Sequence, residues 1–114
     1  MNFSLVDFER ELRRLCQHFF PDAALAFRNR RIHSINCRIQ VTSQIFVDVY
    51  YNARSSRLDF STIQAGQRVF GYDNAGGWHF HPFEQPDRHE SCPEPTLEQI
   101  FAATAQAIEQ VIKR

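Results

Sequence analysis

Residues 35–50 read INCRIQVTSQIFVDVY. Hydrophobic side chains take every second position from Ile35 to Val41, and the same alternation resumes at Ile45 after a polar break at 42–44. A period of two directs alternate side chains to opposite faces of an extended strand. The stretch therefore predicts two half-buried strands that are joined by a turn.

The chain on either side of this stretch adds further strands. Residues 57–64 and 67–73 are hydrophobic enough to form two more strands, and Ala65-Gly66 between them is a typical hairpin turn. A weaker pattern places a short strand near 25–28. Links as short as these join antiparallel neighbours, because a parallel crossover needs about a dozen residues. We therefore predict a four- or five-stranded antiparallel meander.

Amphipathic helices are predicted at both ends of the chain. Leucine and phenylalanine recur every three or four residues over 4–19, with Ser4 as N-cap and Pro21 as the stop signal. A second stripe follows Thr96, which is a good N-cap, and runs to the end of the chain. The sequence thus predicts one α+β domain over 1–114, with both helices packed on one face of the sheet and a polar face toward solvent.

The composition narrows the class of protein. Thirteen Lys and Arg balance thirteen Asp and Glu, so the chain lacks the basic excess of a dedicated nucleic-acid binder. The three cysteines lie far apart and indicate neither a disulfide framework nor a zinc knuckle. We find no signal peptide and no apolar run of about eighteen residues, and therefore expect a cytoplasmic protein that does not enter a membrane.

Residues 74–95 lack a periodic pattern and contain several prolines, so we predict an extended loop there rather than more sheet. His79 and His81 are two positions apart, which directs both rings to one side of an extended backbone. His89 lies where the loop could fold back on them, and Asp73 stands at the root of the loop. These four residues, Asp73, His79, His81 and His89, are the predicted catalytic residues.

Three interpretations of the histidines remain open. One of them can act as a general acid or base in RNA cleavage, with Asp73 as the orienting carboxylate. Alternatively, the three imidazoles could hold a divalent metal, with Asp73 and Asp48 nearby. In the third interpretation His79 and His81 only hydrogen-bond the loop backbone. The leading hypothesis is the first, and it assigns no metal ligand and no cofactor.

Other residues are candidates for binding the substrate. Trp78 could stack on an unpaired RNA base, although it could equally cover the core. Asn74 follows Asp73, and the default role of such a pair is to form a turn. Four arginines lie close together in the sequence: Arg28, Arg30, Arg31 and Arg38. Such dense positive charge suits phosphate contacts, although a simpler explanation is that these side chains only form a solvent-exposed edge of the protein. Asp48, Tyr50 and Asp59 share the predicted polar face of the sheet.

The second half of the chain resembles a known family in its motifs. They are Tyr72-Asp73-Asn74, the stretch Gly77-Trp78-His79-Phe80-His81-Pro82, His89, and a helix that opens Glu94-Pro95-Thr96. In these features the chain is similar to the TumE-type toxins of prokaryotic toxin–antitoxin modules. The resemblance implicates Asp73, Asn74, His79, His81 and His89, and it implies an antitoxin protein as partner.

The leading hypothesis from the sequence is therefore a toxin-like component of a toxin–antitoxin module that acts on RNA by histidine-based acid and base cleavage. A non-enzymatic module, whose histidine loop is structural and which docks a protein partner, is the first alternative. A metal-dependent hydrolase that uses histidine and aspartate is the second.

Overall fold

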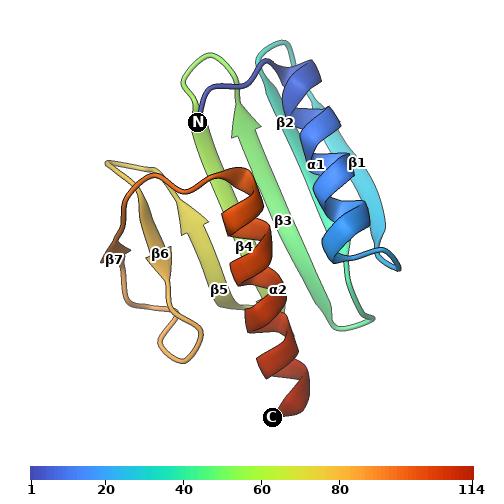
Figure 1. The fold of residues 1–114 in the computed structure, drawn as a ribbon, viewed down its shortest axis with the longest axis vertical. Helices are drawn as coiled ribbons and strands as arrows, with labels where there is room; N and C mark the ends of the chain where they lie inside the picture. The colour runs from blue at the N-terminus through green and yellow to red at the C-terminus, as the bar shows by residue number, and fades with distance from the viewer.

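The computed structural model describes residues 1–114 as two helices and seven strands (Figure 1). The helices are α1 (Leu5–Phe19) and α2 (Leu97–Lys113). The strands are β1 (Ala24–Arg30), β2 (Ser34–Gln40), β3 (Ile45–Asn52), β4 (Arg57–Gln64), β5 (Gln67–Asp73), β6 (His79–His81) and β7 (Glu90–Ser91). They form a single antiparallel sheet in chain order, β1 to β7. The predicted α+β class and antiparallel meander are confirmed.

The predicted number of strands is wrong, because the sheet has seven strands rather than four or five. The two that the sequence pattern missed, β6 and β7, lie within 74–95, which we expected to be a loop. They contain three and two residues, and that is too short for an alternating pattern to show. The prolines do not prevent pairing, because Pro82 follows β6 and Pro93 follows β7.

Side-chain caps fix where both helices begin. The Ser4 side chain accepts the Asp7 N–H at 3.1 Å, as an N-cap does. At α2 the cap is reciprocal: the Thr96 hydroxyl accepts the Gln99 N–H, and the Gln99 side chain accepts the Thr96 N–H. The predicted N-caps of both helices are therefore confirmed.

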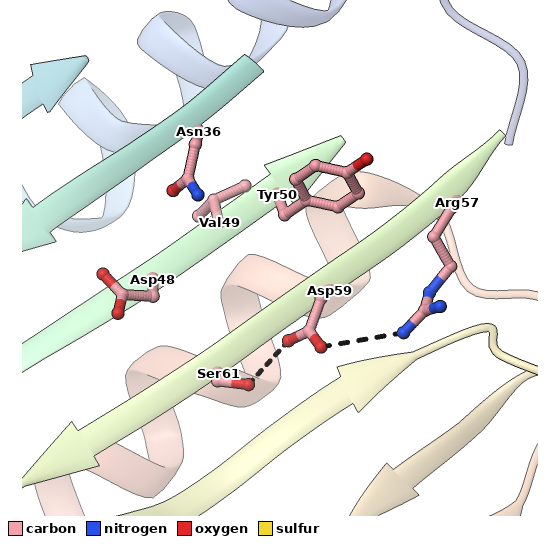
Figure 2. Close-up of a pocket in the computed structure, with 7 residues that line it drawn as sticks. All are labelled: Asn36, Asp48, Val49, Tyr50, Arg57, Asp59 and Ser61. Atoms are coloured by element: carbon pink, nitrogen blue, oxygen red, sulfur yellow. Dashed lines mark hydrogen bonds and ion pairs between the residues drawn. The ribbon is translucent and has the colours of Figure 1, made fainter. Parts of the chain in front are cut away.

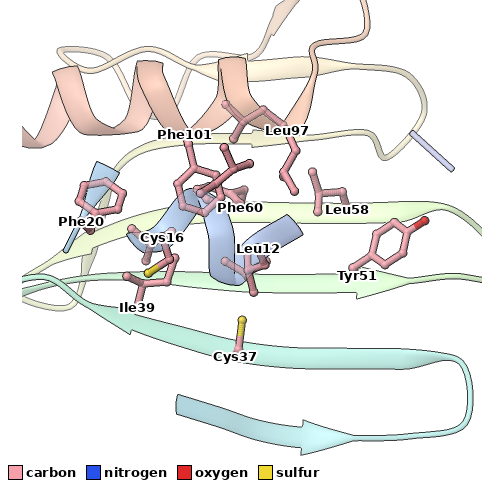
Figure 3. Packing of buried hydrophobic residues seen from close by; sticks show 14 of the residues in the cluster. Leu12, Cys16, Phe20, Cys37, Ile39, Tyr51, Leu58, Phe60, Leu97 and Phe101 are labelled. Atoms are coloured by element: carbon pink, nitrogen blue, oxygen red, sulfur yellow. The ribbon is translucent and has the colours of Figure 1, made fainter. Parts of the chain in front are cut away.

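Both helices cover the same face of the sheet (Figure 1), and one hydrophobic core fills the space between the layers (Figure 3). Leu12 of α1, Phe101 of α2 and Phe60 of β4 are fully buried in it. Cys37 also lies in this core, where burial raises the pKa of its thiol to about 12. Neither helix is long and apolar enough to cross a membrane. The opposite face of the sheet carries no helix, and its side chains form the candidate site.

Candidate functional site

Strand pairing lines up polar side chains in one row across the helix-free face. Each residue of the row pairs with the next across adjacent strands from β2 to β6. The row consists of Asn36, Tyr50, Asp59, Asp73 and His79. His81 lies two residues further along β6, opposite Gly71. The fold thus brings Asp73, which ends β5, beside both histidines of β6.

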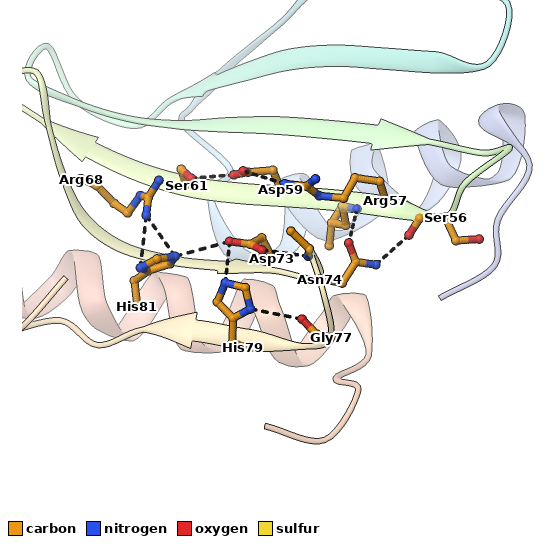
Figure 4. Close-up of polar contacts among 12 residues, drawn as sticks. Ser56, Arg57, Asp59, Ser61, Arg68, Asp73, Asn74, Gly77, His79 and His81 are labelled. Atoms are coloured by element: carbon orange, nitrogen blue, oxygen red, sulfur yellow. Dashed lines mark hydrogen bonds and ion pairs between the residues drawn. The ribbon is translucent and has the colours of Figure 1, made fainter. Parts of the chain in front are cut away.

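Asp73 is buried, and its two carboxylate oxygens have different partners (Figure 4). Oδ1 accepts the Ala75 N–H at 3.0 Å. Oδ2 lies 3.0 Å from Nε2 of His79 and 3.4 Å from Nε2 of His81. Burial works to raise the pKa of Asp73, but the Ala75 N–H and the two histidines outweigh it, so the pKa lies below its ordinary value. Asp73 is therefore a carboxylate at neutral pH.

Both histidines of β6 use Nδ1 to contact a backbone carbonyl. In His81, Nδ1 lies 2.9 Å from the carbonyl oxygen of Pro86. In His79, Nδ1 lies 3.1 Å from the carbonyl oxygen of Gly77. A carbonyl oxygen only accepts hydrogen bonds, so these contacts favour the tautomer with hydrogen on Nδ1. The two Nε2 atoms are then the ones that face Asp73.

His89 completes the cluster from the far end of the loop that follows β6. Its ring centre lies 5.0 Å from that of His79 and 4.4 Å from that of His81. One nitrogen from each of the three rings lies within 4.8 Å of the others. The exposure of the three differs, since His81 is only 2% exposed, His79 is half-buried and His89 is open to solvent. The site is thus anchored in the sheet and accessible at His89.

Arg68 also belongs to this site, although no pattern in the sequence predicted it. Its Nη1 lies 3.1 Å from Nδ1 and 3.0 Å from Nε2 of His81. Simple alternation along β5 would place Arg68 on the face opposite Gly71 and Asp73. A bulge shifts the register between Thr62 and Ile63, so Arg68 instead pairs with Ile63 on the helix-free face. No pattern in the sequence marks this bulge.

Two predicted substrate-binding residues make contacts within the fold. The Asn74 Oδ1 accepts the Leu58 N–H at 2.8 Å, and its Nδ2 donates to the Ser56 oxygen at 2.7 Å. Both halves of the Asn74 amide are therefore used to hold the start of β4. The Trp78 ring packs against the core, and its Nε1 donates to Glu94 at 3.1 Å.

The predicted phosphate-binding arginines lie far from the histidine cluster. Arg28 and Arg30 belong to β1, which is five strand spacings or about 24 Å from β6. Arg30 pairs with Glu9 and lies over the ring of Phe27. Arg31 follows β1 and is exposed.

The fourth of these arginines, Arg38, lies on β2 and is also engaged. It makes two hydrogen bonds with Asp48 at 2.8 and 3.2 Å and stacks on Phe46. The structure therefore does not bring the predicted arginines together with the predicted catalytic residues. Arg68 and Arg57, which no sequence pattern singled out, lie on β5 and β4 near Asp73 (Figure 4), on the helix-free face that they share with Arg38.

The cluster concentrates atoms that accept hydrogen bonds or bind cations. With hydrogen on each Nδ1, a neutral imidazole presents a lone pair on Nε2. The Nε2 lone pairs of His79 and His81 then point at Oδ2 of Asp73. Because lone pairs repel a carboxylate oxygen, a positive charge near these three atoms is needed to stabilise the arrangement. A second proton on His79, together with the Arg68 guanidinium at His81, can supply it. A bound metal ion can supply it equally well.

Comparison of the chain with protein-family models, with curated proteins and with solved structures found no match. The resemblance to TumE-type toxins thus stays a prediction from the sequence.

Proposed function

We propose that His79, His81 and His89 bind a divalent transition-metal ion, with zinc as the first candidate, and that the protein is a metal-dependent hydrolase. Three imidazoles with an open fourth position are a typical catalytic zinc arrangement. Asp73 lies beside this set as a buried carboxylate.

The observation that carries the proposal is the contact of Nδ1 with a backbone carbonyl in both His79 and His81. Histidines that bind metals almost always donate their other N–H to a carbonyl or carboxylate, and this contact orients the ring. His79 and His81 do so through Gly77 and Pro86. Their Nε2 atoms are thereby turned toward the same oxygen of Asp73 before any ion binds.

The spacing of the atoms also suits a metal ion. Ligands about 2.1 Å from a tetrahedral zinc ion lie about 3.4 Å from one another. One nitrogen from each of the three histidines lies within 4.8 Å of the others. His89 lies on an exposed loop and can move the remaining distance, and the exposed Arg68 can turn away from the Nε2 of His81.

Asp73 is suited to act as a general base toward water bound at the fourth position. Its lowered pKa keeps it ionised, and its Oδ2 lies beside the Nε2 atoms that would hold the ion. Arg68 and Arg57 place two positive charges on the same face, which favours an anionic substrate. We therefore propose a phosphodiester, such as RNA, as the substrate. Water oxygen attacks phosphorus, the bond to the leaving oxygen breaks, and the proton taken by Asp73 passes to that oxygen.

A metal-free mechanism is the second candidate, and the contact between His79 and Asp73 favours it. Here Asp73 orients His79 as general base, and the exposed His89 serves as general acid. His81 is less suited to this role than the sequence suggested, because it is 2% exposed and its ring already contacts Pro86 and Arg68.

Metal binding is tested on purified protein without an affinity tag. Isothermal titration with Zn²⁺, Co²⁺ and Mn²⁺ should give one ion per chain, and His79→Ala or His89→Ala should weaken zinc binding at least about tenfold. The exposed His18 and His33 provide matched controls, and His18→Ala and His33→Ala should leave the affinity unchanged. Equal affinity in all four variants would overturn the proposed centre.

Cleavage of an RNA oligonucleotide then separates the two candidates. We expect the chelated protein to be inactive and zinc or manganese to restore its activity. Full activity after exhaustive chelation, with loss of activity in His79→Ala and His89→Ala, would instead establish the metal-free mechanism.

A further inference from the structure

A shallow depression of about 380 Å³ lies on the helix-free face next to the histidine cluster (Figure 2). Tyr50 of β3 and Asp59 and Ser61 of β4 project into it, and Arg57 lines its end. Asp59 pairs directly with Asp73 across β4 and β5. The depression is therefore one strand away from the carboxylate that contacts His79 and His81.

Arg57 is the residue of this depression whose hydrogen-bonding capacity is least used. Its Nη2 lies 4.0 Å from Asp59, which is too far for a hydrogen bond, and its Nε is buried without any partner. The other charges are already engaged. Asp48 is held by Arg38, and Asp59 accepts the Ser61 hydroxyl at 2.7 Å. An anion that reached Arg57 would thus meet free guanidinium donors.

Tyr50 gives the depression an aromatic surface near Arg57, whose guanidinium makes no hydrogen bond. Tyrosine rings stack on nucleic-acid bases with little regard to sequence. Figure 2 shows Tyr50, Asp59 and Arg57 on the same side of the sheet, with the Asp59 carboxylate between Ser61 and the Arg57 guanidinium. The depression therefore combines an aromatic ring, a carboxylate that can accept hydrogen bonds and a guanidinium, one strand away from Asp73.

We propose that this depression binds one nucleotide unit of the substrate. The base stacks on Tyr50, Asp59 accepts a hydrogen bond from the ribose, and the Arg57 guanidinium binds the phosphate. The volume suits a ligand of this size. Tyr50 and His79 are three strand spacings or about 14 Å apart, so a phosphate bound between them lies within reach of the cluster. The proposal deepens the proposed function and rests on it for the identity of the substrate.

The test compares how adenosine monophosphate, adenosine and inorganic phosphate bind to the full chain. NMR or titration calorimetry measures the three affinities. Arg57→Gln should weaken adenosine monophosphate at least about tenfold and leave adenosine unchanged, because only the phosphate contact is lost. Arg54→Gln is the matched control, since Arg54 is an exposed arginine in the β3–β4 connection, three residues before Arg57. Tyr50→Leu should weaken the binding of both adenosine monophosphate and adenosine. Tyr50→Phe should bind both ligands like wild type, because it keeps the aromatic ring.

The outcomes separate this proposal from the metal centre. Binding of adenosine monophosphate should persist in His89→Ala. If the wild-type protein binds adenosine monophosphate but does not cleave RNA, only the proposed hydrolase is refuted. Phosphate that binds as tightly as adenosine monophosphate would show a simple anion site and overturn the nucleotide proposal. So would binding that Arg57→Gln and Tyr50→Leu leave unchanged, provided that both variants give the wild-type circular dichroism spectrum.

Discussion

Asp73 links the turn after β5 to the histidine cluster, because one carboxylate oxygen contacts the turn and the other contacts the cluster. Oδ1 accepts the Ala75 N–H and closes the turn, while Oδ2 contacts His79 and His81. The same side chain therefore has a structural and a chemical role, and the two can be separated by replacing only the charge.

Asp73→Asn is the variant that makes this separation. Asparagine keeps an Oδ1 acceptor for Ala75, so we expect the fold to be retained. Loss of the charge beside the cluster should lower zinc affinity by about 10- to 100-fold. Titration calorimetry measures the affinity, and circular dichroism checks the fold.

Asp22→Asn is a suitable control for this variant, because Asp22 is an exposed aspartate outside the site. Zinc affinity that is the same in Asp73→Asn and in wild type would show that the carboxylate does not contribute to a metal centre.

At the scale of elements, two irregular features of the sheet create the site. The bulge in β5 turns Arg68 to the helix-free face, and Val69 and Phe70 become buried in succession as a result. The short strand β6 then presents His79 and His81 on that face, opposite Asp73 and Gly71. A Cβ on Gly71 would approach the Phe60 oxygen to 3.1 Å, so a larger residue would strain the pairing of β4 and β5 at this point.

Asn74 ties the end of β5 to the start of β4, and its removal should cost stability. Asn74→Ala deletes two hydrogen bonds and leaves the N–H of the fully buried Leu58 without its side-chain acceptor. We expect the free energy of unfolding to fall by about 2–3 kcal/mol. Urea denaturation followed by circular dichroism measures this change.

The exposed Asn29 on β1 is the matched control, and Asn29→Ala should change stability by less than about 0.5 kcal/mol. If Asn74→Ala keeps wild-type stability and instead weakens RNA binding, Asn74 is a substrate-binding residue, as the sequence predicted.

At the scale of the whole molecule, the two faces of the sheet have separate roles. One face and both helices form the core, and the helix-free face carries the histidine cluster and the adjacent depression. This division lets polar residues gather on a rigid sheet without disturbing the hydrophobic layer.

The resemblance to TumE-type toxins predicts an effect of this molecule on cells. If the histidine cluster is the toxic centre, inducible expression of the wild-type chain in bacteria should arrest growth, and His79→Ala and His81→Ala should relieve the arrest. His18→Ala and His33→Ala, which alter exposed histidines outside the cluster, should arrest growth like wild type. Growth curves with immunoblots for expression level provide the measurement. Arrest that His79→Ala and His81→Ala leave unchanged would exclude the cluster as its cause.

Local patterns in the sequence determined the regular part of this fold. Alternation over 35–64 specified strands β2 to β4, because one face of each had to be buried. The Ala65-Gly66 turn and the hydrophobic run after it specified β5. Ser4 and Thr96 specified the starts of the helices, because their side chains satisfy the first free N–H groups. The spacing of His79 and His81 likewise placed both rings on one face.

Only the tertiary structure decided how the site is assembled. Strands β6 and β7 depend on pairing with β5 rather than on their own pattern, since three and two residues have too little hydrophobic surface to specify a strand. The approach of His89, the turn of Arg68 through the bulge and the separation of Arg28 and Arg30 from the cluster are long-range consequences of sheet order and register. Such contacts join residues that are far apart in the chain, and no local sequence pattern predicts them. They form only when the strands have paired into the sheet.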